Sequence, residues 1–341
     1  MRQRALIMGG LLMSMTALTS CGGGGQCEQG ATYAPKTTQA LTAVSFDNDT
    51  RARDAFADIK SKFDRNIDFM MDVYEYAPAY TAQEWMGRNQ LQVTRESTKL
   101  FHSVRDNWEY QIDKNTAFVS AGHADNMHAM APVPVSALLS DQAYMQFAQD
   151  WLSAIPESEL KTSHMSIYPY KIRKYMIGVD DAGNVSEGVS QVAVSFGTTL
   201  DGWPILGDSK TAVHLAVDGT VIGYTKTAML PVKAAFRVSA KDLYTPEEAL
   251  ALAADERGLD VQTAVPSRSE FGYMDFGKHS VRELIYPCYV FVFPSLEGAM
   301  DSVSVIPAVK NAEFAARIEN GNIKELQRKS ALESKEPGDE K

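Results

Sequence analysis

Apolar residues recur at helical spacing in three stretches of the chain. In the first stretch they follow one another at intervals of three or four residues: Phe56, Ile59, Phe63 and Ile67. Ser140 is a good N-cap for the second stretch. The third begins with Thr245 as its cap, continues with Pro-Glu-Glu, and ends at Gly258, which suits a helix C-terminus. We therefore predict helices over 50–67, 141–154 and 245–258.

Apolar and polar residues alternate over much of the remaining chain, which indicates strands. The dipeptide Asp218-Gly219 stands between two alternating runs and favours a hairpin. Strand-rich stretches are predicted over 90–122, 166–178, 191–226, 271–276, 284–293 and 303–309. Helices beside antiparallel strands predict an α+β fold, with helices packed on antiparallel sheets. The order of these elements predicts two small modules in tandem, 46–160 and 161–312.

The first residues have the layout of a secretory signal. Arg2 and Arg4 give a short positive segment, and an apolar run over 5–17 follows. That run is too short to span a bilayer as a helix, which takes about 20 apolar residues. Residues 1–20 are thus predicted to be a signal peptide.

Leu18-Thr19-Ser20-Cys21 resembles the lipobox of bacterial lipoproteins. The resemblance implies cleavage before Cys21, lipid on its sulfur, and anchoring at a membrane of the cell envelope. Gly22 at the next position implies an outer-membrane address facing the periplasm in a Gram-negative cell. Residues 21–45 are small and polar and predict a flexible leash, whereas 313–341 are charged and predict a disordered tail.

The negative net charge of the chain argues against some classes of binding partner. With 341 residues and a net charge of −10, the protein has no basic excess with which to bind phosphate backbones. We expect no nucleic-acid partner and no basic patch docking on anionic lipid. The lipid on Cys21 would provide membrane attachment instead.

The chain has three cysteines and no CxxC motif, so a redox enzyme is not expected. With Cys21 lipidated in an oxidising compartment, Cys27 and Cys288 could form a disulfide that joins the leash to the folded body. The alternative is that Cys288 is a small buried residue of a strand and Cys27 is free.

The segment Gly202-Trp203-Pro204-Ile205-Leu206-Gly207, followed by a strand and Asp218-Gly219, resembles the propeptides of thermolysin- and fungalysin-type proteases. The Thr-Pro-Glu-Glu-Ala-Leu-Ala helix and the strand that follows it are similar to the PepSY module and to YycH/YycI-like bacterial regulators. This resemblance spans about 171–309 and implies two PepSY-like modules that bind or restrain a partner protein without chemistry of their own. It marks Gly202, Trp203, Pro204 and Gly207 as partner-binding candidates, although no protease follows here as it does in the propeptides.

The segment Gly202–Gly207 can also be interpreted from its residues alone, without reference to any family. Pro204 lacks a donor and belongs at an edge or bend, and the two glycines permit positive φ or close backbone approach. Trp203 is either a core residue or an exposed anchor, and we favour the core because aromatic residues are more often buried.

One cluster has the chemistry of metal ligands: His123, Asp125 and His128, with Met127 and Met130 beside them. Imidazole and thioether suit copper, and imidazole with carboxylate suits zinc. The alternative is a solvated loop whose methionines pack on the core. The sequence has no His-Glu-x-x-His, Gly-x-Ser-x-Gly or Walker motif, and Ser158-Glu159-Leu160-Lys161 matches Ser-x-x-Lys only by chance.

These observations favour a non-enzymatic, membrane-tethered lipoprotein that binds or regulates an envelope protein such as a protease or sensor, with no cofactor. The competing hypothesis is a periplasmic metal-binding protein or hydrolase that uses His123, Asp125 and His128.

Overall fold

The computed structural model describes residues 40–45, 50–127, 132–176, 188–207, 210–275, 282–294, 301–310 and 314. Strands dominate these residues and form two sheets, one of 13 strands and one of 3. The strands are β1 (Ala40–Ser45), β2 (Met70–Pro78), β3 (Arg95–Glu96), β4 (Leu100–Arg105), β5 (Trp108–Asp113), β6 (Val119–His123), β7 (Met165–Met176), β8 (Val189–Leu200), β9 (Trp203–Gly207), β10 (Thr211–Ala216), β11 (Val221–Lys226), β12 (Met229–Ser239), β13 (Arg268–Asp275), β14 (Leu284–Ile285), β15 (Pro287–Phe293) and β16 (Ser302–Pro307).

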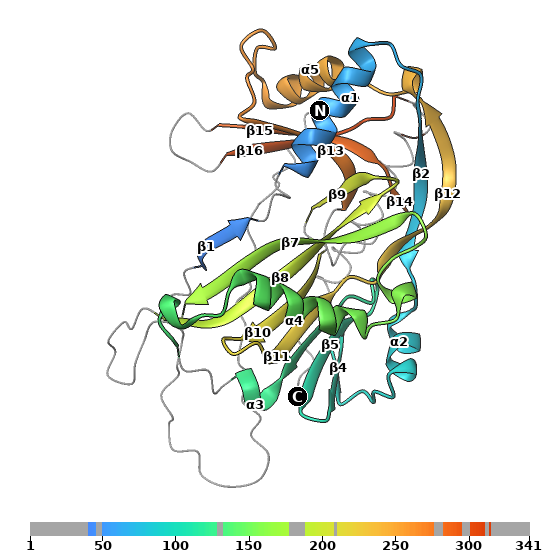
Figure 1. The fold of residues 1–341 in the computed structure, drawn as a ribbon. Helices are drawn as coiled ribbons and strands as arrows, with labels where there is room; N and C mark the ends of the chain where they lie inside the picture. The colour runs from blue at the N-terminus through green and yellow to red at the C-terminus, as the bar shows by residue number, and fades with distance from the viewer. Residues whose placement is uncertain are drawn as a thin grey trace, which may run out of the picture. The chain divides into compact units, whose positions relative to one another are not determined.

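The large sheet has the order β16-β15-β13-β9-β8-β10-β11-β6-β5-β4-β3, and β7 pairs with β8 while β1 pairs with β7. Its described pairings are antiparallel except that of β9 with β13, which is parallel, so the sheet is mixed. The small sheet has the order β12-β2-β14. Figure 1 shows β2 and β12 running side by side as two long, curved strands.

The predicted α+β fold, with helices packed on antiparallel sheets in two PepSY-like modules, is wrong. The structure is mostly β, and strands from 46–160 pair directly with strands from 161–312. β6 pairs with β11, and β2 pairs with β12 over nearly its full length. The backbone N–H and C=O groups of a buried strand need hydrogen-bond partners. For β6 and β2 these partners are strands of the second half of the chain, β11 and β12. Periodicity along a sequence carries no information about such long-range pairing.

The helices begin and end where local side chains favour it. The helices are α1 (Arg51–Asp64), α2 (Ala82–Arg88), α3 (Ala124–Met127), α4 (Asp141–Ser153) and α5 (Pro246–Arg257). Ser140 accepts a hydrogen bond from the N–H of Ala143, and Thr245 forms a capping box with Glu248. Gly258 ends α5 with a φ of 66°. None of the described helices has the length and apolar character needed to cross a membrane.

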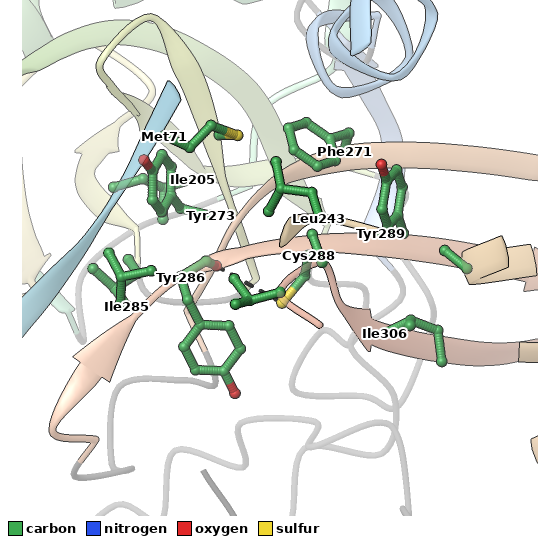
Figure 2. Packing of buried hydrophobic residues seen from close by; sticks show 14 of the residues in the cluster. Met71, Ile205, Leu243, Phe271, Tyr273, Ile285, Tyr286, Cys288, Tyr289 and Ile306 are labelled. Carbon is green, nitrogen blue, oxygen red and sulfur yellow. Dashed lines mark hydrogen bonds between the residues drawn. The ribbon is translucent and has the colours of Figure 1, made fainter. Parts of the chain in front are cut away.

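Three apolar clusters hold the described elements together. The largest lies among β2, β13, β15, α1 and α5 and contains Phe271, Tyr273 and Tyr289 with no exposed surface. Figure 2 shows this packing, in which aromatic rings alternate with aliphatic side chains. A second cluster lies under α4, which crosses the sheet over β8 and β10 (Figure 1), and a third lies under α2.

The strand β12 is the outer strand of the small sheet, and no described strand pairs with its other side. Its register with β2 shifts twice, between Pro231 and Lys233 and between Ala234 and Phe236. These shifts are β-bulges, which bend a strand and increase its twist. β12 is therefore an irregular edge that carries a proline and a lysine.

Candidate binding pocket

The hairpin of β8 and β9 places one end of the Gly-x-Pro segment at the surface. Leu200 pairs with Trp203, so the turn between them has only two residues. Those residues, Asp201 and Gly202, have φ values of 51° and 83°. Positive φ at both positions defines the type I′ turn that suits the twist of a hairpin. The turn holds the Asp201 carboxylate outside the sheet.

The other end of the segment is fixed by close contact between two backbones. Gly207 has a φ of 101°, and a Cβ added there would lie 1.9 Å from the carbonyl oxygen of Asp275. A Cβ added to Gly272 would likewise lie 2.2 Å from the carbonyl oxygen of Pro204. The parallel pairing of β9 with β13 thus depends on glycine on both strands. At Gly207 both expected features, positive φ and close backbone approach, are present, whereas Gly272 was not among the sequence candidates.

Trp203 packs against the core. Its indole is half-buried and meets the ring of Phe271 edge to face, with centroids 5.2 Å apart. The Nζ of Lys62 lies 5.5 Å from the centroid of the Trp203 ring, within the range of a cation–π contact. Trp203 is therefore mainly a core residue with one accessible side, which is nearer to the core interpretation than to an exposed anchor.

That accessible side borders a pocket of about 420 Å³ between α1 and the hairpin. Its walls come from the polar side of α1 and from the hairpin turn, and they include Arg51, Asp54, Asp58, Asp201, Gly202 and Trp203. Three of these side chains carry a carboxylate and one carries a guanidinium. Pro204 also lines the pocket, so three of the four partner-binding candidates lie at it, whereas Gly207 does not.

Two of the pocket's charged side chains have partners within the chain. Asp58 Oδ2 lies 2.5 Å from Lys62 Nζ, and Arg51 stacks its guanidinium 4.2 Å from the centroid of the Tyr168 ring. Among the described residues, none forms a hydrogen bond or ion pair with the carboxylate of Asp54. Asp54 and Asp58 are both exposed, since they lie on the outer side of α1.

Asp201 is held in place from behind by two ring side chains. The hydroxyl of Tyr74 donates to Asp201 Oδ2 at 2.6 Å, and His164 Nδ1 lies 3.3 Å from Asp201 Oδ1. Burial and the hydrogen bond to Asp201 raise the pKa of Tyr74 above its ordinary value, so the hydroxyl stays a donor at neutral pH. The carboxylate is thus oriented before any ligand arrives.

The metal hypothesis stays a prediction, because only two of its three proposed ligands, His123 and Asp125, are among the described residues. His123 ends β6, with its ring edge to face against Trp108, and Asp125 accepts a hydrogen bond from Asn107 at 2.6 Å. His128 and Met130 lie outside the described residues. Within the described part of the chain no group of three or more His, Cys, Asp or Glu side chains is arranged to hold a metal ion.

Of the three cysteines, Cys288 is described. It forms no disulfide with another described residue, is fully buried in β15, and its Sγ lies 3.7 Å from the carbonyl oxygen of Tyr286 (Figure 2). Burial raises the pKa of the Cys288 thiol well above its usual range. Cys21 and Cys27 lie outside the described residues, so lipidation of Cys21 and a bridge between Cys27 and Cys288 stay predictions.

Sequence reasoning found the hairpin side of the pocket and missed the α1 side. Arg51, Asp54, Ala55 and Asp58 follow the helical spacing of three and four residues, but charged positions at that spacing are typical of any solvated helix face. Only the packing of α1 beside β9 and β13 turns this face into a wall.

Comparison of the sequence with known protein families finds no match, and comparison with curated proteins finds none either. Among solved structures, the chain is similar to an uncharacterized protein from Eubacterium rectale ATCC 33656, with 10% sequence identity and a TM-score of 0.36. The match covers 70% of this chain and 82% of that chain. A TM-score below 0.5 does not establish a shared fold.

Proposed function

We propose that this protein is a non-enzymatic lipoprotein of the cell envelope, which is tethered through Cys21 and uses the pocket between α1 and the β8–β9 hairpin to bind a partner protein. Binding there would regulate the partner or hold it at the membrane. The proposal combines the lipobox, which supports the address, with the pocket, which supports the binding role.

The observation that carries the proposal is the place of the pocket. Its walls combine exposed carboxylates of α1 with the half-buried ring of Trp203, beside the exposed turn of the β8–β9 hairpin. The pocket is bounded by fixed elements, since α1 packs on β13 and a two-residue turn sets the hairpin. A preformed wall lowers the entropy lost when a partner binds.

Site-specific photocrosslinking in intact cells tests the proposal. A benzophenone amino acid replaces Ala57, the exposed residue directly before Asp58 on α1. The matched control carries the same group at Ala154, an exposed alanine that follows α4. We expect an adduct with an envelope protein from position 57 and not from position 154. The same adducts from both positions, or none from position 57, would contradict the proposal.

A further inference from the structure

The geometry points to a basic side chain as the group that the pocket takes: a lysine or arginine exposed on the partner protein, received between the carboxylates of Asp54 and Asp58 and the accessible side of Trp203. This inference rests on the proposed function, because it specifies the chemistry of the partner that the function requires.

The first argument is the charge of the walls. Among the residues that line the pocket, Asp54, Asp58 and Asp201 carry carboxylates and Arg51 carries a cation, which lies over the ring of Tyr168. Lys62 at the edge of the pocket pairs with Asp58, so the carboxylates still exceed the cations. The whole chain has a net charge of −10. An acidic site on an acidic protein attracts a basic partner at long range and at contact.

The second argument is that the chain already holds a cation at the edge of this site. The ammonium of Lys62 contacts the Asp58 carboxylate and the indole of Trp203 together. One carboxylate and one aromatic ring are therefore close enough here to hold a single amino group. A carboxylate forms charge-assisted hydrogen bonds with lysine and arginine, and the face of an indole ring attracts their charge.

The third argument is that Asp54 supplies a carboxylate that the described part of the chain leaves without a bond. An incoming cation would pair with Asp54 first and share Asp58 with Lys62. Asp201, fixed by Tyr74 and His164, sets the opposite wall. Because the half-buried ring of Trp203 gives the pocket an apolar side, the methylene groups of a lysine or arginine also find a surface to cover.

A peptide titration tests the inference with the full-length lipoprotein in a neutral detergent. The probe is acetylated tetralysine amide, and the control peptide is acetylated tetraglutamine amide. We expect tetralysine to bind, tetraglutamine not to bind, and D54N to weaken tetralysine binding about two- to fivefold. D54N combined with D58N should weaken it further, and added salt should weaken binding to the unsubstituted protein.

The matched variant is D64N, which removes the same charge from the same helix outside the pocket, where Asp64 pairs with Lys60. D64N should leave tetralysine binding within about twofold, given the small worth of exposed ion pairs. Equal losses from D54N and D64N would overturn the inference, because they would show attraction to net charge alone. Absence of tetralysine binding would overturn it as well.

The two proposals fail in different ways. If the adduct at position 57 forms but tetralysine neither binds the protein nor reduces the adduct, the inference of a basic side chain is wrong and the proposed binding function stands. If tetralysine binds through Asp54 but no adduct forms in cells, the binding function is wrong and the chemistry of the pocket stands.

Discussion

At the scale of single residues, the two glycines of the β8–β9 segment have different tasks. Both have positive φ, which an L-residue with a Cβ adopts at a cost of about 1–2 kcal/mol. A Cβ on Gly202 would meet nothing within 4 Å, whereas one on Gly207 would collide with the backbone of β13. Gly202 is therefore needed for the turn, and Gly207 for both its conformation and the parallel pairing.

Substitution of these glycines by alanine tests this distinction. We expect G207A to lower the free energy of unfolding by about 3 kcal/mol, because backbone strain and a steric clash add, and G202A to lower it by about 1 kcal/mol. G87A is the control, since Gly87 lies in α2 without positive φ and a Cβ there meets nothing within 4 Å. It should raise stability by about 0.5 kcal/mol. Urea unfolding gives all three values, and equal effects of G207A and G202A would refute the clash.

At the scale of elements, a buried ion pair joins α2 to the large sheet. Lys226 at the end of β11 lies 2.5 Å from Glu159, and their side chains are only 2% and 10% exposed. The indole N–H of Trp85 in α2 donates to the same carboxylate at 3.0 Å. Burial raises the pKa of Glu159, but the hydrogen bond from Lys226 and its charge outweigh burial and hold that pKa below its ordinary value.

Removal of Lys226 should therefore be costly and dependent on pH. We expect K226M to lose about 3–5 kcal/mol at pH 8, where it leaves an unpaired buried carboxylate. K233M, which removes a lysine that is 68% exposed, should change stability by less than about 0.5 kcal/mol.

The sign of the pH dependence follows from the two states of Glu159. In the unsubstituted protein its lowered pKa stabilises the fold above the ordinary carboxyl pKa, and this stabilisation is lost as the pH falls through the lowered value. Without Lys226, burial outweighs the remaining hydrogen bond from Trp85 and the charge of Arg88, so the pKa of Glu159 rises and the carboxyl group takes up a proton in the folded state. The deficit of K226M should thus shrink between pH 8 and pH 4.5 in denaturant titrations. A constant deficit would show that the carboxylate is not the cause.

The elements also show what local sequence can predict and what it cannot. The predicted helix after Thr245 is confirmed because its cap, its proline and its terminal glycine are all within one short segment. β12 was missed because a proline and two bulges interrupt its alternation, and β2 was missed because its adjacent residues Val73 and Tyr74 are both buried. The pocket follows the same division between local and long-range information. Its hairpin wall could be predicted from a few neighbouring residues. Its α1 wall could not, because it depends on packing between segments more than a hundred residues apart.

At the scale of the whole molecule, the proposed attachment to the membrane would depend on one atom, the sulfur of Cys21. The predicted signal sequence would be removed from the mature protein, and lipid on this cysteine would then be the means of anchoring. Lipid with more than one acyl chain holds a protein at a bilayer stably, whereas a single chain does not.

The substitution C21S tests the anchor. We expect mass spectrometry to show an acylated N-terminal cysteine on the unsubstituted protein, which should fractionate with membranes. C21S should lack the lipid and leave the membrane fraction. C27S is the control, because it removes a nearby cysteine and should leave both the lipid and the fractionation unchanged. An unmodified Cys21 in a cytosolic precursor would refute the proposed address.

Tethering would also bring copies of this protein close together, because molecules held on a surface meet far more often than molecules free in solution. An open strand edge is then a hazard, since it can recruit the same edge from a neighbour and start a growing stack. β12 is poorly suited to such recruitment: Pro231 offers no N–H, the two bulges break the regular spacing of donors and acceptors, and Lys233 adds charge. The irregularity that hid this strand from sequence analysis would let the protein be displayed at high density without sheets joining from one molecule to the next.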